Sequence, residues 1–293
     1  MWHGATTRQA GAARDMVLPR LDVLYEASGL PALDLPASLA EAYGGSLGFA
    51  GPQVCANFVA TVDGVVAIPS VPSSNKLIAA GSASDRFVMG LLRACADVLM
   101  IGSGTLAASP RSLWTPDQAY PDAAAAFAEL RSTIGKPPRP ELAILSGRGL
   151  VDAGHPLFAA GAVVLTTDTG AARLHGTLPA ASEVISLGAG DELDPRKIVA
   201  ALEARGHRLI LSEGGSHSLA PLLAAGAVDE LFLTVSPLLV GRTPADPRLG
   251  LVEGADLLSG GPLEAELIGV RRDGDHLFLR YRLGRSGGDR LPS

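Results

Sequence analysis

Two glycine-bearing turns, each at the end of a predicted strand, are the strongest candidates for a ligand site. The first, GSGTLA at residues 102–107, follows the apolar run ADVLMI, and the second, SEGGS at residues 212–216, follows the apolar run at 209–211. Glycine lets the backbone pass close to a ligand, and a helix start offers unpaired amides and the positive end of the helix dipole. A helix is expected directly after the second turn, so this turn predicts a diphosphate site. Glu213, at the strand end, is placed to bind a substrate hydroxyl or amine.

Both turns also have an ordinary structural interpretation. The first matches the G-x-G-x-x-G/A pattern of dinucleotide-binding domains, but that pattern alone is unspecific. Pro110 follows closely and argues against a long helix after the turn. No acidic residue ends a second strand about 20 positions later, as a Rossmann domain requires. A Rossmann dehydrogenase is therefore disfavoured, and a plain tight turn or a structural strand-turn-helix stays open as the alternative.

Other polar residues near predicted strand ends are weaker candidates. Asp63 and Gly64 fit a plain turn after the first strand, and Arg93 lies in an otherwise apolar helix, where a solvated or salt-bridged arginine is the default. Arg148 follows a strand and either holds a 2′-phosphate or points to solvent. His217 comes directly after the second glycine turn, and the six histidines form no set with metal-ligand spacing. Because the sequence has no G-x-S-x-G, Walker or H-E-x-x-H motif, hydrolase and metal chemistry are not expected.

The composition indicates an ordinary globular protein and leaves a nucleotide cofactor possible. Of the 293 residues, 47% are hydrophobic and 18% are charged, and the net charge of −6 disfavours nucleic acid as a partner. Cys55 and Cys95 lie in apolar runs and are expected to be core residues. No apolar run is long enough for a membrane span, and the start of the chain lacks the apolar core of a signal peptide. We therefore predict a cytoplasmic protein.

Strand-like and helix-like runs alternate along most of the chain. We expect regular structure to begin with a strand at residues 54–64 and only one short helix, at 39–43, before it. Further predicted strands lie at 98–101, 142–145, 163–166, 184–187, 209–211 and 230–235. Helices are expected at 85–96 and 218–225 and between Asp194-Pro195 and Gly206, where a cap residue with proline begins the helix and glycine ends it. Apolar strands with little alternation favour a parallel sheet covered by helices on both faces.

Two segments depart from this alternation. LIGVRR and HLFLRYRL flank Asp273-Gly274-Asp275, which predicts an antiparallel hairpin at the C-terminal end of the mostly parallel sheet. The insertion at residues 108–140 contains Trp114, Tyr120 and a helical stretch at 123–131. Its length is consistent either with a lid over the substrate or with a surface excursion that packs on itself.

Three stretches together resemble a known family. They are NFVATVDGVVA at 57–67, SDRFVMGLLRACADVLMIGSGTL at 84–106 and LILSEGGSHSLAPLLAAGAVDELFLTVSPLLVG at 209–241. The chain is similar to the C-terminal reductase domain of bifunctional riboflavin-biosynthesis deaminase–reductases and to their stand-alone pyrimidine-reductase relatives. The resemblance implies a dihydrofolate-reductase-like α/β fold over residues 52–283, with a partly flexible extension at 1–51 and a tail at 284–293. No deaminase motif, H-x-E with P-C-x-x-C, is present.

The resemblance also implies site residues, an NADPH cofactor and a homodimer. Cofactor-binding residues at matching positions are Thr61, Ala67, Gly102, Gly104, Thr105, Ser146, Arg148, Gly214, Gly215 and Ser216. Thr61 and Ala67 lie around the nicotinamide half in this alignment, residues 214–216 form the diphosphate turn, and Ser146 and Arg148 meet the adenosine 2′-phosphate. Substrate-binding residues are Asp63, Arg93 and Glu213, with Arg93 at the ribose-phosphate end. No catalytic side chain and no metal are implied.

The chain departs from the family after the first glycine turn. The deaminase–reductases carry an A-D-D-P-like segment and a nearby arginine there, whereas this chain reads LAASPR at 106–111. The carboxylate is missing, and Arg111 or Arg139 would have to take the place of the phosphate clamp.

The reaction that the resemblance implies is hydride transfer to the anomeric carbon of a ribosylamino-pyrimidine phosphate, which gives a ribitylamino product. Such a reaction needs few acid–base residues, because the cofactor carries the chemistry. Two alternatives stay open: a reductase of a pterin, folate or other C=N or C=O substrate on the same frame, and an NADPH-binding protein without catalytic activity.

Overall fold

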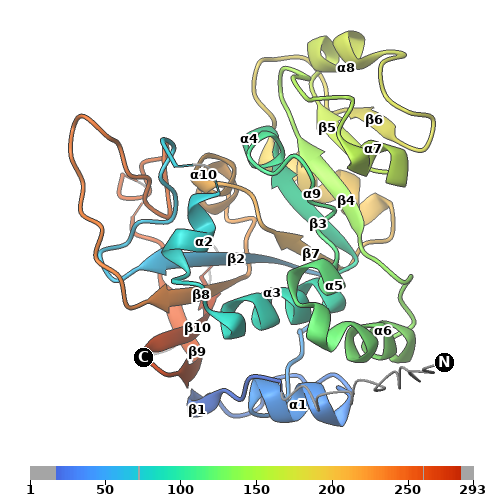
Figure 1. Ribbon diagram of the computed structural model, residues 1–293. Helices are drawn as coiled ribbons and strands as arrows, with labels where there is room; N and C mark the ends of the chain where they lie inside the picture. Colours follow the sequence, from blue (N-terminus) through green and yellow to red (C-terminus); the bar gives the residue numbers. More distant parts are fainter. Residues whose placement is uncertain (1–17, 72, 260, 285–293) are drawn as a thin grey trace, which may run out of the picture.

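The computed structural model describes residues 18–71, 73–259 and 261–284. These residues build one sheet of ten strands in the order β1-β9-β10-β8-β2-β7-β3-β4-β5-β6 (Figure 1). The first part of the predicted extension, residues 1–17, and most of the predicted tail lie outside the described residues.

Seven neighbouring strands, from β8 to β6, run parallel, and β10, β9 and β1 continue the sheet in antiparallel fashion. The strands are β1 Asp22–Glu26, β2 Gln53–Thr61, β3 Val98–Gly102, β4 Glu141–Leu145, β5 Val163–Thr166, β6 Glu183–Ser186, β7 Leu209–Ser212, β8 Glu230–Ser236, β9 Ala265–Asp273 and β10 His276–Leu283. The mostly parallel sheet and the C-terminal hairpin are confirmed. The six strands predicted between residues 98 and 235 are confirmed within one residue at each end.

Helices cover both faces of this sheet. They are α1 Ala37–Tyr43, α2 Ser74–Ile78, α3 Ala83–Cys95, α4 Ser103–Ala107, α5 Pro116–Ala119, η1 Pro121–Ala123, α6 Ala124–Thr133, α7 Pro156–Ala160, α8 Asp168–Leu174, α9 Pro195–Ala204 and α10 Ser216–Ala224. The predicted cap of α9 is confirmed, since the Asp194 side chain accepts from the Arg196 amide at 2.9 Å. No helix in the described part of the chain is long and apolar enough to cross a membrane.

Strand residues alternate between two apolar cores, one on each face. Along β3, Leu99 and Ile101 pack into the core formed with α1, α3 and α6, whereas Val98 and Met100 pack into the core formed with α9 and α10. Because both faces of the sheet are buried at β3, the residues that point to either face are apolar, as is typical of a parallel sheet covered by helices on both sides. Cys55 and Cys95 are buried free thiols in the first core, as expected.

The sequence analysis missed strand β1, which pairs with β9 at the edge of the sheet. All five residues of β1 are exposed, so the strand has no buried face and shows none of the apolar alternation by which strands are found. The expectation that regular structure begins near residue 54 is therefore wrong.

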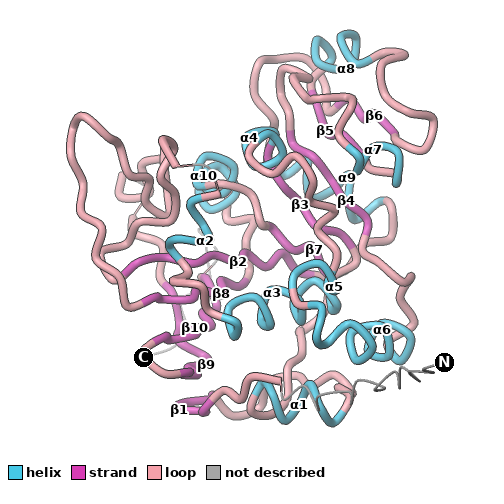
Figure 2. Tube along the Cα trace, in the orientation of Figure 1, coloured by secondary structure: helices cyan, strands magenta, loops and turns pink. Residues whose placement is uncertain are grey.

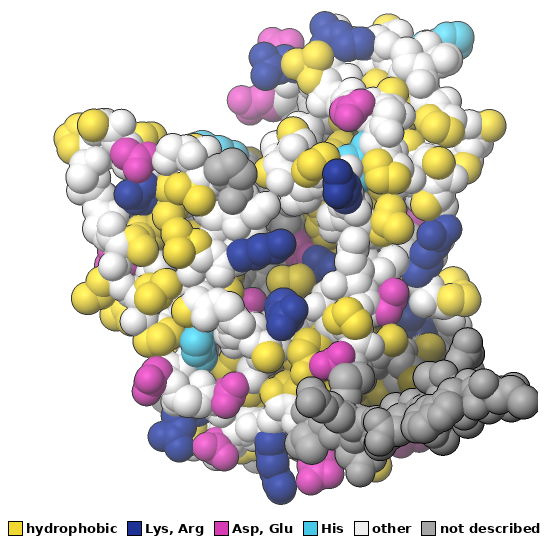
Figure 3. Space-filling view, in the orientation of Figure 1, with side chains coloured by type: hydrophobic (Ala, Val, Ile, Leu, Met, Phe, Trp, Pro, Cys, Tyr) yellow, Lys and Arg dark blue, Asp and Glu magenta, His cyan; other side chains and the backbone are white. Residues whose placement is uncertain are grey.

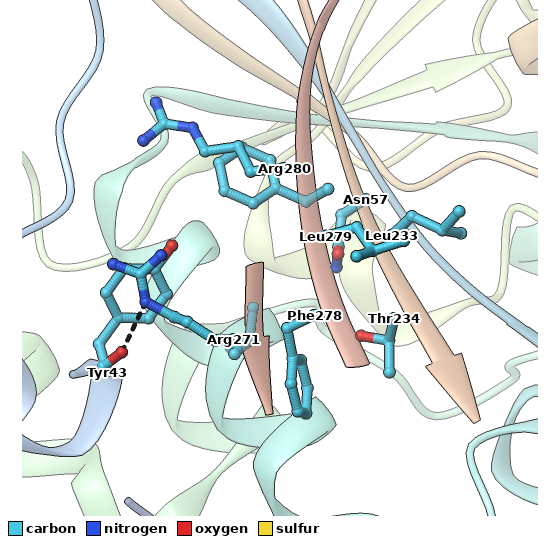
Figure 4. Close-up of a pocket in the computed structure, with 10 residues that line it drawn as sticks. Tyr43, Asn57, Leu233, Thr234, Arg271, Phe278, Leu279 and Arg280 are labelled. Carbon is cyan, nitrogen blue, oxygen red and sulfur yellow. Dashed lines mark hydrogen bonds between the residues drawn. The ribbon is translucent and has the colours of Figure 1, made fainter. Parts of the chain in front are cut away.

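Two buried arginines hold the segment before β2 against the sheet. Arg271 donates to the Tyr43 carbonyl at 2.8 Å, and its guanidinium lies 3.9 Å from the centre of the Tyr43 ring (Figure 4). Arg280 donates to the Gly48 carbonyl at 2.6 Å and forms a buried ion pair with Glu230 at 2.8 Å. The segment before β2 therefore packs into the same apolar core as one face of the sheet.

The insertion at 108–140 packs firmly on α3. The side chain of Arg131, from α6, is buried and donates to the carbonyls of Arg93, Ala94 and Ala96 at 2.8–3.3 Å, where α3 ends. Phe127 also stacks on Phe87 with ring centres 6.2 Å apart. These contacts favour a packed excursion over a mobile lid.

Candidate functional site

The site lies at the carboxyl ends of the parallel strands. There β7 lies between β2 and β3, so Thr61 and Gly102, which end β2 and β3, and Glu213, which follows β7, lie at one edge of the sheet. In open α/β sheets, ligands bind outside this edge. Figure 3 shows the face hollowed between the part of the molecule that carries α2 and the part that carries β4 to β6, and Figure 2 shows the loops that border this hollow.

The two glycine turns meet, as their positions on neighbouring parallel strands predict. A Cβ added to Gly102 would lie 2.4 Å from Ser218 Oγ, and one added to Gly214 would lie 3.0 Å from Ser218 Cβ and 3.6 Å from the Gly102 amide nitrogen. The Glu213 amide also donates to the Met100 carbonyl at 2.9 Å. The two turns are therefore closely packed: a side chain at Gly102 would displace the Ser218 hydroxyl, and one at Gly214 would press against Ser218 Cβ.

Each turn begins a helix whose N-terminal amides receive no side-chain cap. Gly102 is the cap residue of α4 and Gly215 that of α10, and neither position has a side-chain hydrogen bond to the helix. Ser216 Oγ is buried and has no hydrogen-bond partner within the described residues. Open amides beside an unsatisfied hydroxyl form a cradle for an anion. Residues 214–216 thus fit the diphosphate of a dinucleotide, and Gly104 and Thr105 lie in the adjoining helix α4.

Arg93 and Glu213, which the resemblance assigns to substrate, form one buried ion pair. Arg93 Nη2 lies 2.6 Å from Glu213 Oε2, and Arg93 Nε lies 3.1 Å from both carboxylate oxygens. The remaining Nη1 donates to the Thr115 carbonyl at 3.3 Å. Only 7% of the Arg93 side chain and 8% of the Glu213 side chain are exposed. The default expectation of a salt-bridged arginine is confirmed, and the guanidinium is already engaged on each nitrogen.

The segment after β2 is connected to the loop after β8 beside the site, through Thr61, Asp63 and Ala67. The Thr61 hydroxyl donates to Asp63 at 2.5 Å, and the Asp63 carboxylate also accepts from the Gly241 amide at 2.7 Å. These hydrogen bonds, that from Thr61 first, hold the pKa of Asp63 below its usual value. Ala67 pairs with Leu249 of the loop at 237–264. The Asp63 carboxylate is thereby committed to fixing this loop.

A pocket of about 430 Å³ opens next to the cradle. Its walls come from α4, from the turn after β4 and from α8, and include Ser103, Leu106, Gly149, Leu150, Arg173 and Leu174. Ser146, at the start of this turn, is buried and donates to the Leu150 carbonyl at 3.3 Å, whereas Arg148 is exposed. The Arg173 guanidinium donates to the carbonyl of Arg148.

Sequence reasoning missed Arg173 and the helix α8 that carries it. A signal was available, because Thr167 and Asp168 follow β5 at the same edge and begin a helix, with the Thr167 hydroxyl accepting from the Gly170 amide at 3.2 Å. Of the two arginines considered for a phosphate clamp, Arg139 precedes β4 and donates to the Ala160 carbonyl at 2.8 Å. It therefore lies at the opposite edge of the sheet, which leaves Arg111 as the candidate.

Comparison with known proteins identifies the family. The model of the RibD C-terminal domain matches residues 52–279. The chain belongs to the RibD C-terminal domain family. Family membership makes the chain an oxidoreductase, as the sequence predicts. No curated protein sequence matches the chain.

Solved structures share the dihydrofolate-reductase-like fold expected from the sequence. A pyrimidine reductase-like protein from Corynebacterium diphtheriae is 23% identical with a TM-score of 0.62, over 80% of this chain and 92% of that one. The deaminase–reductase of Thermotoga maritima is 18% identical with a TM-score of 0.57, over 79% of this chain but only 56% of its own length. The riboflavin biosynthesis reductase Rib7 of Saccharomyces cerevisiae is 16% identical with a TM-score of 0.52, over 82% of this chain and 94% of its own.

Proposed function

We propose that this chain is an NADPH-dependent reductase of riboflavin biosynthesis that acts on 5-amino-6-(5-phosphoribosylamino)uracil, the compound named for the reductase activity of the Thermotoga maritima relative. The observation that carries the proposal is the meeting of two uncapped helix starts, α4 and α10, at the carboxyl edge of the sheet. Family membership supports the reaction class.

The chain's own residues bind and orient the reactants. Residues 214–216 would hold the diphosphate, the pocket beside α8 would take the adenosine part, and Thr61 and Ala67 would border the nicotinamide. NADPH, when bound, would supply a hydride to C1 of the ribosylamino sugar, where the bond to the ring oxygen breaks, and that oxygen takes a proton from water to give the ribitylamino product. The buried Arg93–Glu213 pair would then border the place where substrate meets the cofactor, because Glu213 directly precedes the proposed diphosphate turn. Orientation and charge complementarity are the contribution of the protein.

The proposal is tested by binding and turnover in the same preparation. We expect NADPH to raise the Tm of the chain, and the absorbance of its reduced nicotinamide to fall on addition of 5-amino-6-(5-phosphoribosylamino)uracil. Binding of NADPH without oxidation by this compound would support a different substrate, which the missing carboxylate at 106–111 favours. If NADPH binds but is oxidised by no pyrimidine, pterin or folate substrate, the result would favour a cofactor-binding protein without catalytic activity. Absence of NADPH binding would contradict the proposal.

Arg148 is expected to set the preference for NADPH over NADH. We propose that its side chain turns over the pocket of about 430 Å³ and meets the 2′-phosphate, since Arg148 is exposed and precedes Gly149 and Leu150, which line this pocket. Arg148→Ala should raise the KM for NADPH roughly 10-fold to 100-fold, the worth of one charge-assisted hydrogen bond, and leave the KM for NADH unchanged. Arg173→Ala, measured alongside, shows whether the neighbouring arginine takes this role. An unchanged KM ratio in the Arg148 variant would refute its assignment.

We further propose a homodimer formed through the antiparallel end of the sheet. Exposed apolar side chains gather there on β1, β9 and β10, namely Leu24 at 52%, Tyr25 at 46%, Leu267 at 37% and Leu277 at 36% exposure. Light scattering should give twice the chain mass of 29.9 kDa. A monomeric mass at the concentration of the activity assay would contradict the proposal. The cytoplasmic location stays a prediction from the sequence.

A further inference from the structure

His155 is a buried histidine whose two ring nitrogens both contact backbone groups. Its Nδ1 accepts from the Leu157 amide at 3.2 Å, which makes it the cap of α7. Its Nε2 lies 3.0 Å from the Ser109 carbonyl oxygen, and only 4% of the residue is exposed. Because the amide can only donate and the carbonyl can only accept, these contacts assign the neutral tautomer with its proton on Nε2. His155 therefore joins two segments that lie 46 positions apart.

The cap of α7 alone does not explain the choice of a histidine. The helices α3, α8 and α9 are capped by Ser82, Thr167 and Asp194, which belong to the residue types preferred at this position. Histidine is not one of the preferred types. What it adds is a second nitrogen that donates, and here this nitrogen reaches a carbonyl of another segment. The contact with Ser109 is therefore the distinctive property of His155.

The two segments that His155 joins form opposite walls of the pocket beside the diphosphate cradle. One wall is α4, which ends at Ala107, and Ser109 follows two positions later. The other wall is the turn at 149–153, and His155 also follows it by two positions. The hydrogen bond between His155 and Ser109 thus ties the two walls together just beyond the residues that line the pocket.

The chain that follows Ser109 is held in one shape. The side-chain oxygen of Gln118 accepts from the amides of Leu113 and Trp114 at 2.7 and 3.1 Å, and its side-chain nitrogen donates to the Arg111 carbonyl at 3.4 Å. Trp114 is buried with φ +51°, a left-handed conformation that is costly for a bulky residue. Its ring lies against the imidazole, with ring centres 6.0 Å apart. The tie at Ser109 therefore connects the pocket to a well-ordered segment.

The far end of this segment contacts the buried ion pair of the site. The Thr115 carbonyl accepts from Arg93 Nη1 at 3.3 Å. The turn built around Gln118 lies between this contact and Ser109. Loss of the His155 contact should therefore change the pocket wall while the Arg93–Glu213 pair keeps its place.

We propose that His155 is a positioning residue for the cofactor: by tying α4 to the turn at 149–153, it sets the shape of the pocket that receives the adenosine part of NADPH. The inference rests on the proposed function, which places the adenosine part in this pocket, and adds a side chain that acts on cofactor affinity without lining the pocket. A preformed pocket binds more tightly, because the ligand does not have to order its walls.

Two substitutions at His155 separate the tie from the helix cap. His155→Asn keeps a preferred cap residue for α7 but is too short to reach the Ser109 carbonyl. His155→Gln gives up the cap and has the length to donate its side-chain amide to that carbonyl. In His155→Asn the KM for NADPH should rise roughly 10-fold with kcat within about twofold of wild type, since the nicotinamide end keeps its contacts. In His155→Gln the KM should stay within about threefold of wild type.

Binding of 2′,5′-ADP, which carries the adenosine end alone, gives a readout without turnover. Calorimetric titration should show roughly 10-fold weaker binding to His155→Asn than to wild type, and near wild-type binding to His155→Gln. His207→Asn is the matched control, because the His207 ring contacts Glu141 at 2.5 Å at the opposite edge of the sheet. This control should bind 2′,5′-ADP as the wild type does.

The outcomes separate this inference from the proposed function. Wild-type affinity in His155→Asn overturns the role of His155 and leaves the reductase proposal intact. A greater loss in His155→Gln than in His155→Asn also overturns it, because the helix cap would then shape the pocket. Equal losses in both variants overturn it as well, since the Ser109 contact would make no difference. A wild-type chain that binds neither NADPH nor 2′,5′-ADP overturns the proposed function, and the inference with it.

Hydrogen exchange in the wild-type chain gives a readout that does not depend on either variant folding. The Nε2 proton of His155 is followed by NMR with and without 2′,5′-ADP. At a ligand concentration of about ten times Kd, exchange of this proton should slow roughly 10-fold, because the ligand stabilises the closed walls that the hydrogen bond joins. An exchange rate that saturating 2′,5′-ADP leaves unchanged would overturn the inference.

Discussion

Gly215→Val should weaken NADPH binding by roughly 100-fold or more while the chain keeps its fold. The backbone at Gly215 has φ −73°, which any residue adopts, and an added Cβ would meet nothing nearer than Thr105 Oγ1 at 3.9 Å. The native fold therefore has room for the side chain. That room lies in front of the uncapped amides of α10, where the diphosphate is proposed to bind, so the valine would compete with phosphate oxygens rather than with protein atoms.

The measurement is NADPH affinity by fluorescence titration, with Tm as the check on folding. Gly102→Ala would be a poorer test, because its Cβ would lie 2.4 Å from Ser218 Oγ and disturb the packing of both turns. Gly284→Val is a suitable control, since a Cβ there meets the Glu264 carbonyl oxygen at 3.5 Å and lies at the far end of β10. If Gly215→Val binds NADPH as tightly as the control, the diphosphate lies elsewhere.

Most of the fold was predictable because its signals are local. Strands such as Val163–Thr166 are short apolar runs buried on both faces, and Asp194-Pro195 marks the start of α9 by its own chemistry. Strand β1 carries no such signal, because it is exposed on every residue and is held by its pairing with β9, more than 200 positions away. Pairing at that separation cannot be inferred from a single window of sequence.

The site was predictable only in part, for the same reason. Parallel strands bring their carboxyl ends together, so the meeting of the turns at Gly102 and Gly214 followed from the fold. The pairing of Arg93 with Glu213 did not, since it joins residues 120 positions apart and depends on how α3 lies over β7.

We expect Arg93→Met to have the second large effect, which is mainly a loss of folding stability. Removing the guanidinium leaves the Glu213 carboxylate buried without a cation, which costs roughly 3–5 kcal/mol in comparable buried pairs. The double variant Arg93→Met with Glu213→Gln removes both charges and should regain most of this loss. Urea unfolding of the wild-type chain, both single variants and the double variant gives the coupling energy. A stability of Arg93→Met within about 1 kcal/mol of wild type would show that the pair is solvated in solution.

Kinetics then distinguishes the two roles open to Arg93. If the arginine binds the substrate phosphate, as the resemblance to the deaminase–reductases implies, its loss should harm the phosphorylated substrate more than the dephosphorylated one. We expect equal losses in kcat/KM for both, because every guanidinium nitrogen is already directed to Glu213 or to the Thr115 carbonyl. Arg93 then orients the Glu213 carboxylate, and lysine, which cannot make the same two-nitrogen contact, should not restore activity in its place. A loss confined to the phosphorylated substrate would mean that the ion pair opens when substrate binds, and that the phosphate takes the place of Glu213.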